Sequence, residues 1–278
     1  MFTINCRGNL IQMNEPIVMG ILNITPDSFY KGYLSNSMDE IKVRISSMIT
    51  EGASIIDVGG QSTRPGSVRI HEQEELDRIL PIIEFINNEF PDTIISIDTY
   101  YSKVAAEALN SGASIINDVS AGEFDPDMIP LAGKHKVPYI CMHMQGTPES
   151  MQINPSYENI TKNVLDFFIQ KKEQCIKAGI IDIIFDPGFG FGKTTQHNFS
   201  LLSNLSIFKM LECPLLVGLS RKGMIYKTIN SSASEALNGT TVLNTMALKN
   251  GANILRVHDV REAKEAITLM TEYKKAAH

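Results

Sequence analysis

The chain has 278 residues, of which 43% are apolar and 20% are charged, and its formal net charge is −6. This length suits one large domain or two small ones, and the composition is that of a globular protein able to bury a full core. The negative charge argues against a general nucleic-acid binder and suits an enzyme of small molecules.

Cysteine usage and the first residues bear on the compartment. The cysteines at 6, 141, 175 and 213 form no C-x-x-C pair, which is typical of free thiols in a reducing compartment. Residues 1–16 are polar and mixed, unlike a signal peptide. No apolar run approaches the roughly 20 residues that a membrane span needs. We therefore expect a cytoplasmic protein that binds neither membranes nor nucleic acid.

Eight short apolar runs end in a polar residue. Four of them follow a glycine at which a helix is expected to end. These runs are rich in Ile and Val with little alternation, as in a parallel sheet covered by helices on both faces. The predicted strands lie within residues 17–22, 51–58, 94–97, 111–119, 137–142, 178–186, 215–219 and 250–258.

The segments between these runs carry apolar residues at helical spacing. Eight successive β-then-α units in this length predict a (β/α)8 TIM barrel, and no linker or charge block divides residues 1–278, so we expect a single domain. A doubly wound sheet is the alternative, but it would have fewer strands and a glycine-rich first turn, which is missing. The predicted helices are 38–50, 71–89, 102–109, 125–135, 157–177, 198–211, 233–249 and 260–274.

Active sites of such barrels lie at the carboxyl ends of the strands. In this chain those ends carry hydrogen-bonding side chains, which we expect to form a ring around the barrel mouth. Each could instead bind loop backbone or cap the next helix, and Asp57, which two glycines follow, is the first candidate for a structural role. The ring consists of Asn23, Asp57, Asp98, Asn117 with Asp118, His143, Asp186, Ser220 with Lys222, and Arg256 with His258.

Two predicted loops, 23–33 and 59–66, are longer than an ordinary βα connection, which is typical of functional loops. The second contains Arg64, which could bind a phosphate or carboxylate in bidentate fashion. The loops after the last two strands often form an anion site in barrels. Here they offer Ser220, Lys222, Arg256 and His258 to an anionic substrate.

Residues 183–194 read IIFDPGFGFGKT and look like a phosphate loop at first sight. The G-x-x-x-x-G-K-[ST] pattern fails because Pro187 stands where its first glycine belongs. What remains is Asp186 at a strand end, beside a loop that a ligand can approach closely. Asp98 and Asp186 could do acid–base work, or they could accept hydrogen bonds from a planar heterocycle with adjacent N–H and NH2 groups.

Two other classes of enzyme, metallohydrolases and hydrolases with a serine nucleophile, find little support in the sequence. Cys141 and His143 are two potential zinc ligands, but tetrahedral sites need three or four. The first strand has no His-x-His, and a G-x-S-x-G nucleophile elbow is absent.

Seven motifs in order resemble the dihydropteroate synthase family, over about residues 17–274. They are GILNITPDSF at 20–29, DVGGQSTRPG at 57–66, SIDT at 96–99, INDV at 116–119, DPGFGFGK at 186–193, GLSRK at 218–222 and RVHD at 256–259.

The resemblance implies a folate-pathway transferase that joins 6-hydroxymethyl-7,8-dihydropterin diphosphate to p-aminobenzoate, giving 7,8-dihydropteroate and pyrophosphate. It implies a homodimer, Mg2+ as cofactor, and Asn23 as a ligand of that Mg2+ on the diphosphate. By motif position, Asp98, Asn117, Asp186 and Lys222 would hold the pterin edge, Met142 would line the pocket, Arg256 would contact the pterin face and the diphosphate, and His258 would contact the anion. Thr63, Arg64, Pro65, Phe191 and Ser220 would bind p-aminobenzoate, with Asn23, Arg64, Lys222, Arg256 and His258 as the catalytic set.

The chain departs from the family pattern in places. The first loop has Lys31, Gly32 and Tyr33 where an acid and two glycines are frequent, and Gln61 replaces a frequent Glu. An acid in that loop could stabilise a cationic transition state, whereas Lys31 could instead bind pyrophosphate.

Two alternatives remain open. The pterin-binding barrel of corrinoid methyltransferases shares the ring-binding acids, although Thr63-Arg64-Pro65 and Ser220-Arg221-Lys222 favour the synthase. A non-catalytic paralogue that binds pterin is indicated by Lys31 alone.

Overall fold

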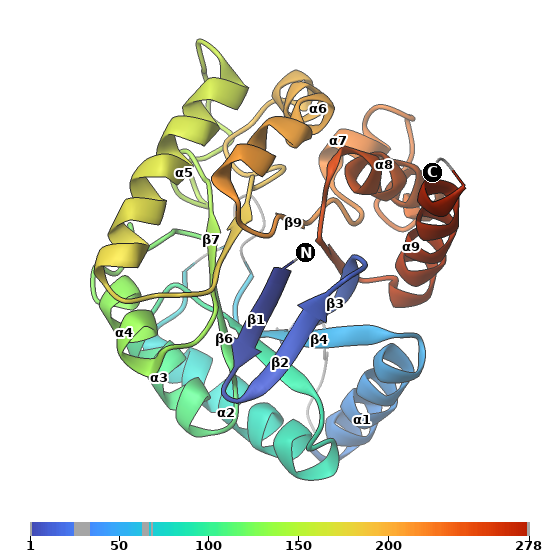
Figure 1. The fold of residues 1–278 in the computed structure, drawn as a ribbon. Helices are drawn as coiled ribbons and strands as arrows, with labels where there is room; N and C mark the ends of the chain where they lie inside the picture. The colour runs from blue at the N-terminus through green and yellow to red at the C-terminus, as the bar shows by residue number, and fades with distance from the viewer. Residues whose placement is uncertain (1, 25–33, 63–66, 68, 277–278) are drawn as a thin grey trace.

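The central sheet has eight parallel strands that nearly close into a barrel (Figure 1). The computed structural model describes residues 2–24, 34–62, 67 and 69–276. A parallel bridge between Phe185 and Leu215 joins the two edges of the sheet. In sheet order the strands are β8 (Ile183–Asp186), β7 (Tyr139–Met142), β6 (Ile115–Asp118), β5 (Ile94–Asp98), β4 (Ala53–Gly59), β3 (Ile17–Asn23), β10 (Ile254–Val257) and β9 (Leu216–Val217). The predicted barrel is confirmed.

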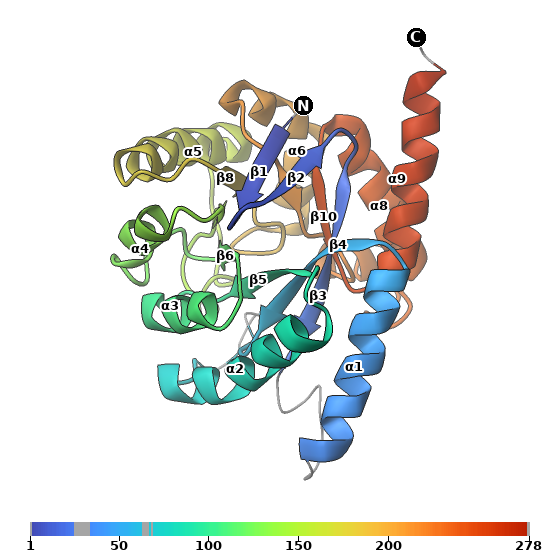
Figure 2. The ribbon, with the colours of Figure 1, turned by 60° about the horizontal axis from the view of Figure 1, so that its bottom comes forward.

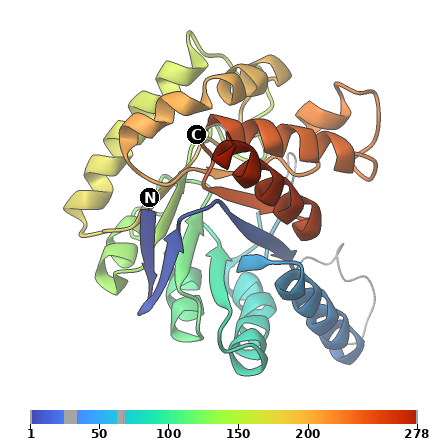
Figure 3. The ribbon, with the colours of Figure 1, turned by 45° about the vertical axis from the view of Figure 1, so that its right-hand side comes forward.

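Helices form the outer ring of the barrel (Figure 3). Between sheet and helices lies the main apolar core, in which Phe168, Phe185 and Phe208 are fully buried. The helices are α1 (Leu34–Thr50), α2 (Glu72–Glu89), α3 (Ser102–Asn110), α4 (Met128–His135), α5 (Ile160–Lys177), α6 (Thr195–Ser203), the 3-10 helix η1 (Leu205–Leu211), α7 (Gly223–Tyr226), α8 (Leu237–Asn250) and α9 (Val260–Lys275).

The single helix predicted over 198–211 is wrong, because α6 and η1 divide that segment. Thr194 accepts a hydrogen bond from the backbone N–H of His197, so α6 begins earlier than expected. At its end, Asn204 Nδ2 donates to the Ser200 carbonyl at 2.8 Å, a local bond that competes with helix continuation. The short helix α7 was not predicted either.

The barrel end at which the strands begin is covered by an antiparallel hairpin of β1 (Phe2–Cys6) and β2 (Asn9–Met13) (Figure 2). Ile4, Cys6 and Met13 pack against a layer of apolar side chains inside the barrel. The sequence patterns did not predict this hairpin. The inner layer holds one residue from each strand: Met19, Ile55, Ile94, Ile115, Ile140, Ile184, Leu216 and Ile254.

Strand alternation connects this inner layer with the mouth. Successive side chains on a strand point to opposite faces, so a residue two positions on faces the interior again. Counting by two from the inner layer reaches polar residues on most strands, at the end away from the hairpin: Asp57, Ser96 followed by Asp98, Asn117, Asp186 and Arg256.

Two further features bear on the sequence predictions. All four cysteines are buried and unpaired. Among the described helices, none combines the length and apolar character needed to cross a bilayer.

Candidate active site

Arg256 lies at the centre of the polar layer and joins two carboxylates from neighbouring strands. Its Nε donates to Asp57 Oδ2 at 2.6 Å, and its Nη2 donates to Asp98 Oδ2. Burial disfavours the charged form of Arg256, but Asp57 and Asp98 outweigh this and raise its pKa. Asn117 Nδ2 donates to the same oxygen of Asp57 at 3.0 Å. Asp57 therefore orients two of the predicted ligand residues, Asn117 and Arg256.

Each of these carboxylates keeps one oxygen without a partner. Asp57 Oδ1 and Asp98 Oδ1 are buried and accept no hydrogen bond from the described residues. Burial raises the pKa of Asp98 to about 7, against the opposing charge of Arg256. Because a buried acceptor without a donor costs free energy, these oxygens mark a place where a ligand's N–H groups would be stabilised.

Neighbouring polar residues on β6 have different environments. Asn117 faces the interior, whereas Asp118 faces the helices and is satisfied there. Asp118 Oδ1 accepts from the N–H of Ser120 at 2.8 Å, and Asp118 Oδ2 accepts from the hydroxyl of Tyr139 at 2.8 Å. Asp118 thus holds its own loop, so its predicted place in the ring around the mouth is wrong, whereas Asn117 faces the mouth.

The glycine-rich loop after β8 turns tightly past Asp186. Gly188 has φ 66° and Gly192 has φ 62°, a region that favours glycine. A Cβ on Gly188 would lie 2.0 Å from the carbonyl oxygen of His143, and one on Gly192 would lie 2.3 Å from that of Gln145. The close turn allows the N–H of Gly188 to donate to Asp186 Oδ1 at 2.8 Å. Burial raises the pKa of Asp186, although the charge of Lys222 opposes this shift.

Lys222 approaches this loop from the end of β9, which is next to β8 where the sheet closes. Its Nζ donates to the Phe189 carbonyl and lies 4.8 Å from the centroid of the Phe191 ring. Burial lowers the pKa of Lys222 to about 8, while Asp186 opposes the shift. Gly218 lies close to both Lys222 and Arg256. A Cβ added to Gly218 would lie 3.8 Å from Lys222 Nζ and 3.9 Å from Arg256 Cβ, so the two basic residues lie on the same side of the mouth.

Ser220 and His258 also lie together, with 3.0 Å between Ser220 Oγ and His258 Nδ1. Next to them, Arg221 makes a bidentate pair with Asp259, with both bonds at 2.9 Å. The sequence patterns predicted no role for Arg221 itself. Ser220 and Lys222 face the mouth, so the intervening Arg221 is expected to point away from it. This alternation was the signal in the sequence for a structural role of Arg221.

Two further predicted residues border the acids. A Cβ on Gly59 would lie 3.3 Å from Asn23 Oδ1 and 3.5 Å from Asp98 Cβ, so Asn23 and Asp98 flank the same glycine. Met142 is buried at the end of β7, where its Cγ would lie 3.2 Å from a Cβ on Gly188.

The base of the second long loop explains one departure from the family pattern. Gln61 Nε2 donates to Glu75 Oε2 at 2.8 Å, and the Tyr100 hydroxyl donates to Gln61 Oε1 at 2.7 Å. Burial raises the pKa of Glu75 to about 8. Gln61 uses both ends of its amide, and a glutamate there would place a second buried carboxyl beside Glu75.

Six residues singled out from the sequence lie outside the described residues. They are Thr63, Arg64 and Pro65 of the second loop and Lys31, Gly32 and Tyr33 of the first. Elsewhere, within residues 2–24, 34–62, 67 and 69–276, no three His, Cys, Asp or Glu side chains form a cluster that could hold a metal ion.

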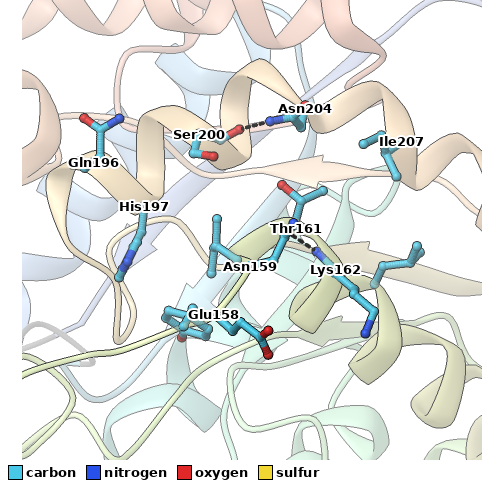
Figure 4. A pocket seen from close by; sticks show the side chains of 12 residues that line it. Glu158, Asn159, Thr161, Lys162, Gln196, His197, Ser200, Asn204 and Ile207 are labelled. Carbon is cyan, nitrogen blue, oxygen red and sulfur yellow. Dashed lines mark hydrogen bonds between the residues drawn. The ribbon is translucent and has the colours of Figure 1, made fainter.

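A separate groove of about 580 Å³ lies outside the barrel, between the start of α5 and α6 (Figure 4). Asn159 and Lys162 line it on one side, and His197 and Ser200 line it on the other. Asn159 Oδ1 already accepts the N–H of Lys162 at 3.0 Å as the helix cap. None of the predicted site residues lines this groove, so we place the candidate active site at the barrel mouth.

Comparisons with known proteins agree with this geometry. A model of the pterin binding enzyme family matches residues 19–258. Dihydropteroate synthase of Escherichia coli K12 is 42% identical over 266 residues, covering 95% of this chain and 94% of that protein. The structure of the Yersinia pestis dihydropteroate synthase with a sulfonamide drug complex has a TM-score of 0.92 and 39% identity, covering 99% of this chain and 100% of that one. The Xanthomonas albilineans dihydropteroate synthase with 4-aminobenzoic acid has a TM-score of 0.91 and 33% identity, covering 98% of each chain. This chain belongs to the dihydropteroate synthase family of pterin-binding enzymes.

Proposed function

We propose that the chain condenses 6-hydroxymethyl-7,8-dihydropterin diphosphate with p-aminobenzoate, giving 7,8-dihydropteroate and pyrophosphate. The family membership supports this transferase reaction. The structural observation that carries it is the set of buried carboxylates at the mouth. Among the described residues Asp98 Oδ1 has no donor, and Asp186 lies beside the cation of Lys222. Carboxylates in this setting suit the adjacent N–H and NH2 groups of a pterin.

For the pterin, Asp98 and Asp186 would accept the ring's N–H groups from opposite sides of the barrel. Asn117, held by Asp57, would present its amide oxygen to the same edge, and Lys222 would donate to a ring acceptor. Met142 would form an apolar wall. Arg256 now binds Asp98, so pterin binding would require Arg256 to leave that carboxylate and turn toward the ring face and the diphosphate.

The diphosphate would bind Arg256, on β10, and His258, which directly follows that strand. Asn23 would hold Mg2+, since its amide oxygen beside Gly59 is a hard ligand at the edge of the acidic layer. Magnesium sites commonly use one or two protein ligands together with substrate phosphates, so this arrangement fits the ion. The metal would supply charge neutralisation for the leaving diphosphate.

The second substrate would lie against the face of Phe191, beside Ser220, with Thr63, Arg64 and Pro65 of the second loop around its carboxylate. Arg64 would make the ionic contact. In the reaction, the C–O bond between the pterin methylene and the diphosphate breaks, and the aryl amine forms a C–N bond with the methylene and then loses a proton. An aryl amine needs no strong base, so catalysis consists of holding both substrates together and stabilising the leaving anion.

We propose further that the protein is a cytoplasmic homodimer. Four buried free thiols suit a reducing compartment. Val242 and Met246 lie one helical turn apart on α8, and Leu269 and Tyr273 lie one turn apart on α9, all of them exposed. Exposed apolar side chains on two adjacent helices are the kind of surface that a second subunit would cover.

The reaction is tested by measuring pyrophosphate release with both substrates and Mg2+. We expect pyrophosphate to be released only when p-aminobenzoate is present, and EDTA to abolish the release. An equimolar amount of 7,8-dihydropteroate should form. In a parallel assay, a methylated folate and a cobalamin protein are offered as substrates, because these are the substrates of a corrinoid methyltransferase. Binding of the pterin without any release would identify a non-catalytic paralogue and would contradict the proposed function.

A further inference from the structure

The buried amine of Lys193 has no part in the reaction proposed above. Its side chain is 2% exposed. Nζ donates to the carbonyl oxygens of Gly188 at 2.9 Å, Phe191 at 3.0 Å and His143 at 3.2 Å, and lies 2.9 Å from His143 Nδ1. All these partners are neutral. Burial of a lysine is costly unless its donors are satisfied, so the loop that surrounds Lys193 should account for it.

That loop, residues 188–193, is held almost entirely through its backbone. Two of its carbonyls, those of Gly188 and Phe191, bind Lys193 itself. Two others bind side chains from the connection between β7 and α5, since the carbonyl of Gly190 accepts from Gln152 at 2.6 Å and that of Gly192 accepts from Tyr157 at 2.8 Å. Among the N–H groups, that of Gly190 donates to Asn198 Oδ1 at 2.8 Å, and that of Phe191 donates to the Gly188 carbonyl at 3.1 Å.

Lys193 is the donor at the centre of this arrangement. Among the described side chains that donate to this loop, only Lys193 binds two loop carbonyls. It also binds the carbonyl of His143, which directly follows β7. Four hydrogen-bonding partners surround this one nitrogen, the three carbonyls and His143 Nδ1, and burial lowers the pKa of Lys193. A hydroxyl has a single donor, so it could not bind two of these carbonyls at once.

The loop in turn positions groups of the candidate active site. Its Phe189 carbonyl accepts from Lys222, and its Phe191 ring faces the same amine at 4.8 Å. Its Gly188 N–H fixes one oxygen of Asp186. A change in the loop would therefore move Phe191 and Lys222, whereas Asp98 on β5 would stay in place.

We propose that Lys193 is a positioning residue, which holds the glycine-rich loop so that the Phe191 ring faces the second substrate. This inference rests on the proposed function for its kinetic consequence. Lys193 touches no reacting atom and acts through the loop backbone, and Phe191, whose carbonyl it binds directly, is the group that depends on it most.

The test replaces Lys193 by methionine, which keeps a similar chain length and removes the donors. We expect the KM for p-aminobenzoate to rise about 10-fold or more, because the variant leaves buried carbonyls of the loop without their donor. Affinity for 6-hydroxymethylpterin, measured by calorimetry, should fall less than that for p-aminobenzoate. The loop contacts the pterin site only through Asp186 and Lys222, whereas Asp98 and Asn117 lie on other strands. Amide hydrogen exchange at Gly190 and Phe191 should become faster in the variant.

Lys172→Met is the matched control. Lys172 Nζ also donates to a backbone carbonyl, that of Leu211, but far from the mouth. It should leave the KM and the exchange of the loop unchanged. If Lys193→Met does not fold, Lys193→Gln, which retains two donors, should give an intermediate rise in KM.

The outcomes separate this inference from the proposed function. A folded Lys193 variant with the wild-type KM and wild-type exchange at Gly190 and Phe191 would overturn the positioning role. If the wild-type chain releases no pyrophosphate, the proposed function fails, and hydrogen exchange in the loop alone decides whether Lys193 holds it. Equal losses of affinity for the pterin and for p-aminobenzoate would also overturn the inference, because Lys193 would then not act specifically on the binding of the second substrate.

Discussion

Replacement of Asp186 by alanine is expected to weaken pterin binding about 100-fold or more, as loss of a charged acceptor from a buried site predicts. Asp186 is 6% exposed, and the N–H of Gly188 holds one of its oxygens in place. Alanine would leave the ring's N–H groups without an acceptor in a dry pocket. Calorimetry with 6-hydroxymethylpterin measures the effect without requiring turnover.

Asp182→Ala is the matched control for this experiment. Asp182 lies at the other end of β8, where its Oδ2 accepts the N–H of Asn5 from the hairpin at 2.9 Å. Its removal should affect stability slightly and leave the pterin affinity unchanged. Wild-type pterin affinity in Asp186→Ala would remove the role assigned to that carboxylate.

Arg256→Met should abolish turnover and also destabilise the fold. Arg256 neutralises Asp57 and Asp98, which are nearly inaccessible. Removal of one partner from a buried ion pair typically costs about 3–5 kcal/mol, because the remaining charges are uncompensated. Urea unfolding of the variant, compared with Arg261→Met, measures this cost. Arg261 forms an exposed pair with Glu265, for which we expect a change below about 1 kcal/mol.

The cost of Arg256→Met should grow with pH. The pKa of Asp98 in the folded state, about 7, lies above the value near ~4 of an unfolded chain, so stability falls as the pH rises between them. Without Arg256 the folded pKa rises further, and the fall continues above pH 7. The variant should therefore be closer to wild type at pH 5 than at pH 8.5. If the difference in stability between variant and wild type is the same at pH 5 and at pH 8.5, the pKa of Asp98 does not depend on Arg256.

Much of the fold was predictable because each strand ends in the same way. Short apolar runs with a polar end, four of which follow a glycine that stops a helix, predicted eight strands at the positions of β3 to β10. The site followed from the same pattern, since the carboxyl ends of barrel strands meet at one mouth. Alternation along β6 also separates Asn117 from Asp118, and this pattern is sufficient to assign Asp118 to the helix side of the sheet.

Other features depend on contacts between distant segments. The hairpin over residues 2–13 was missed although residues 2–6 alternate between apolar and polar and Gly8 lies in the turn. Its packing partners, the side chains of the barrel's inner layer beneath Ile4 and Met13, come from strands distant in the sequence. The role of Gln61 depends on Glu75 and Tyr100, which are distant in the sequence and adjacent in the fold. Lys193 binds carbonyls that the tight turns of its own loop bring together with the end of β7, and no pattern of residue types predicts that convergence.

The most direct test of the pterin site is the relative affinity of 6-hydroxymethylpterin and 6-hydroxymethyllumazine, measured by calorimetry at pH 8, where Asp98 is charged. Lumazine carries a carbonyl in place of the pterin's amino group, so an acceptor would face the carboxylates. We predict that the pterin binds about 100-fold more tightly or better, as expected for a site built around hydrogen-bond donors of its ligand. Equal affinity for the two compounds would contradict the assignment of Asp98 and Asp186 to the pterin edge.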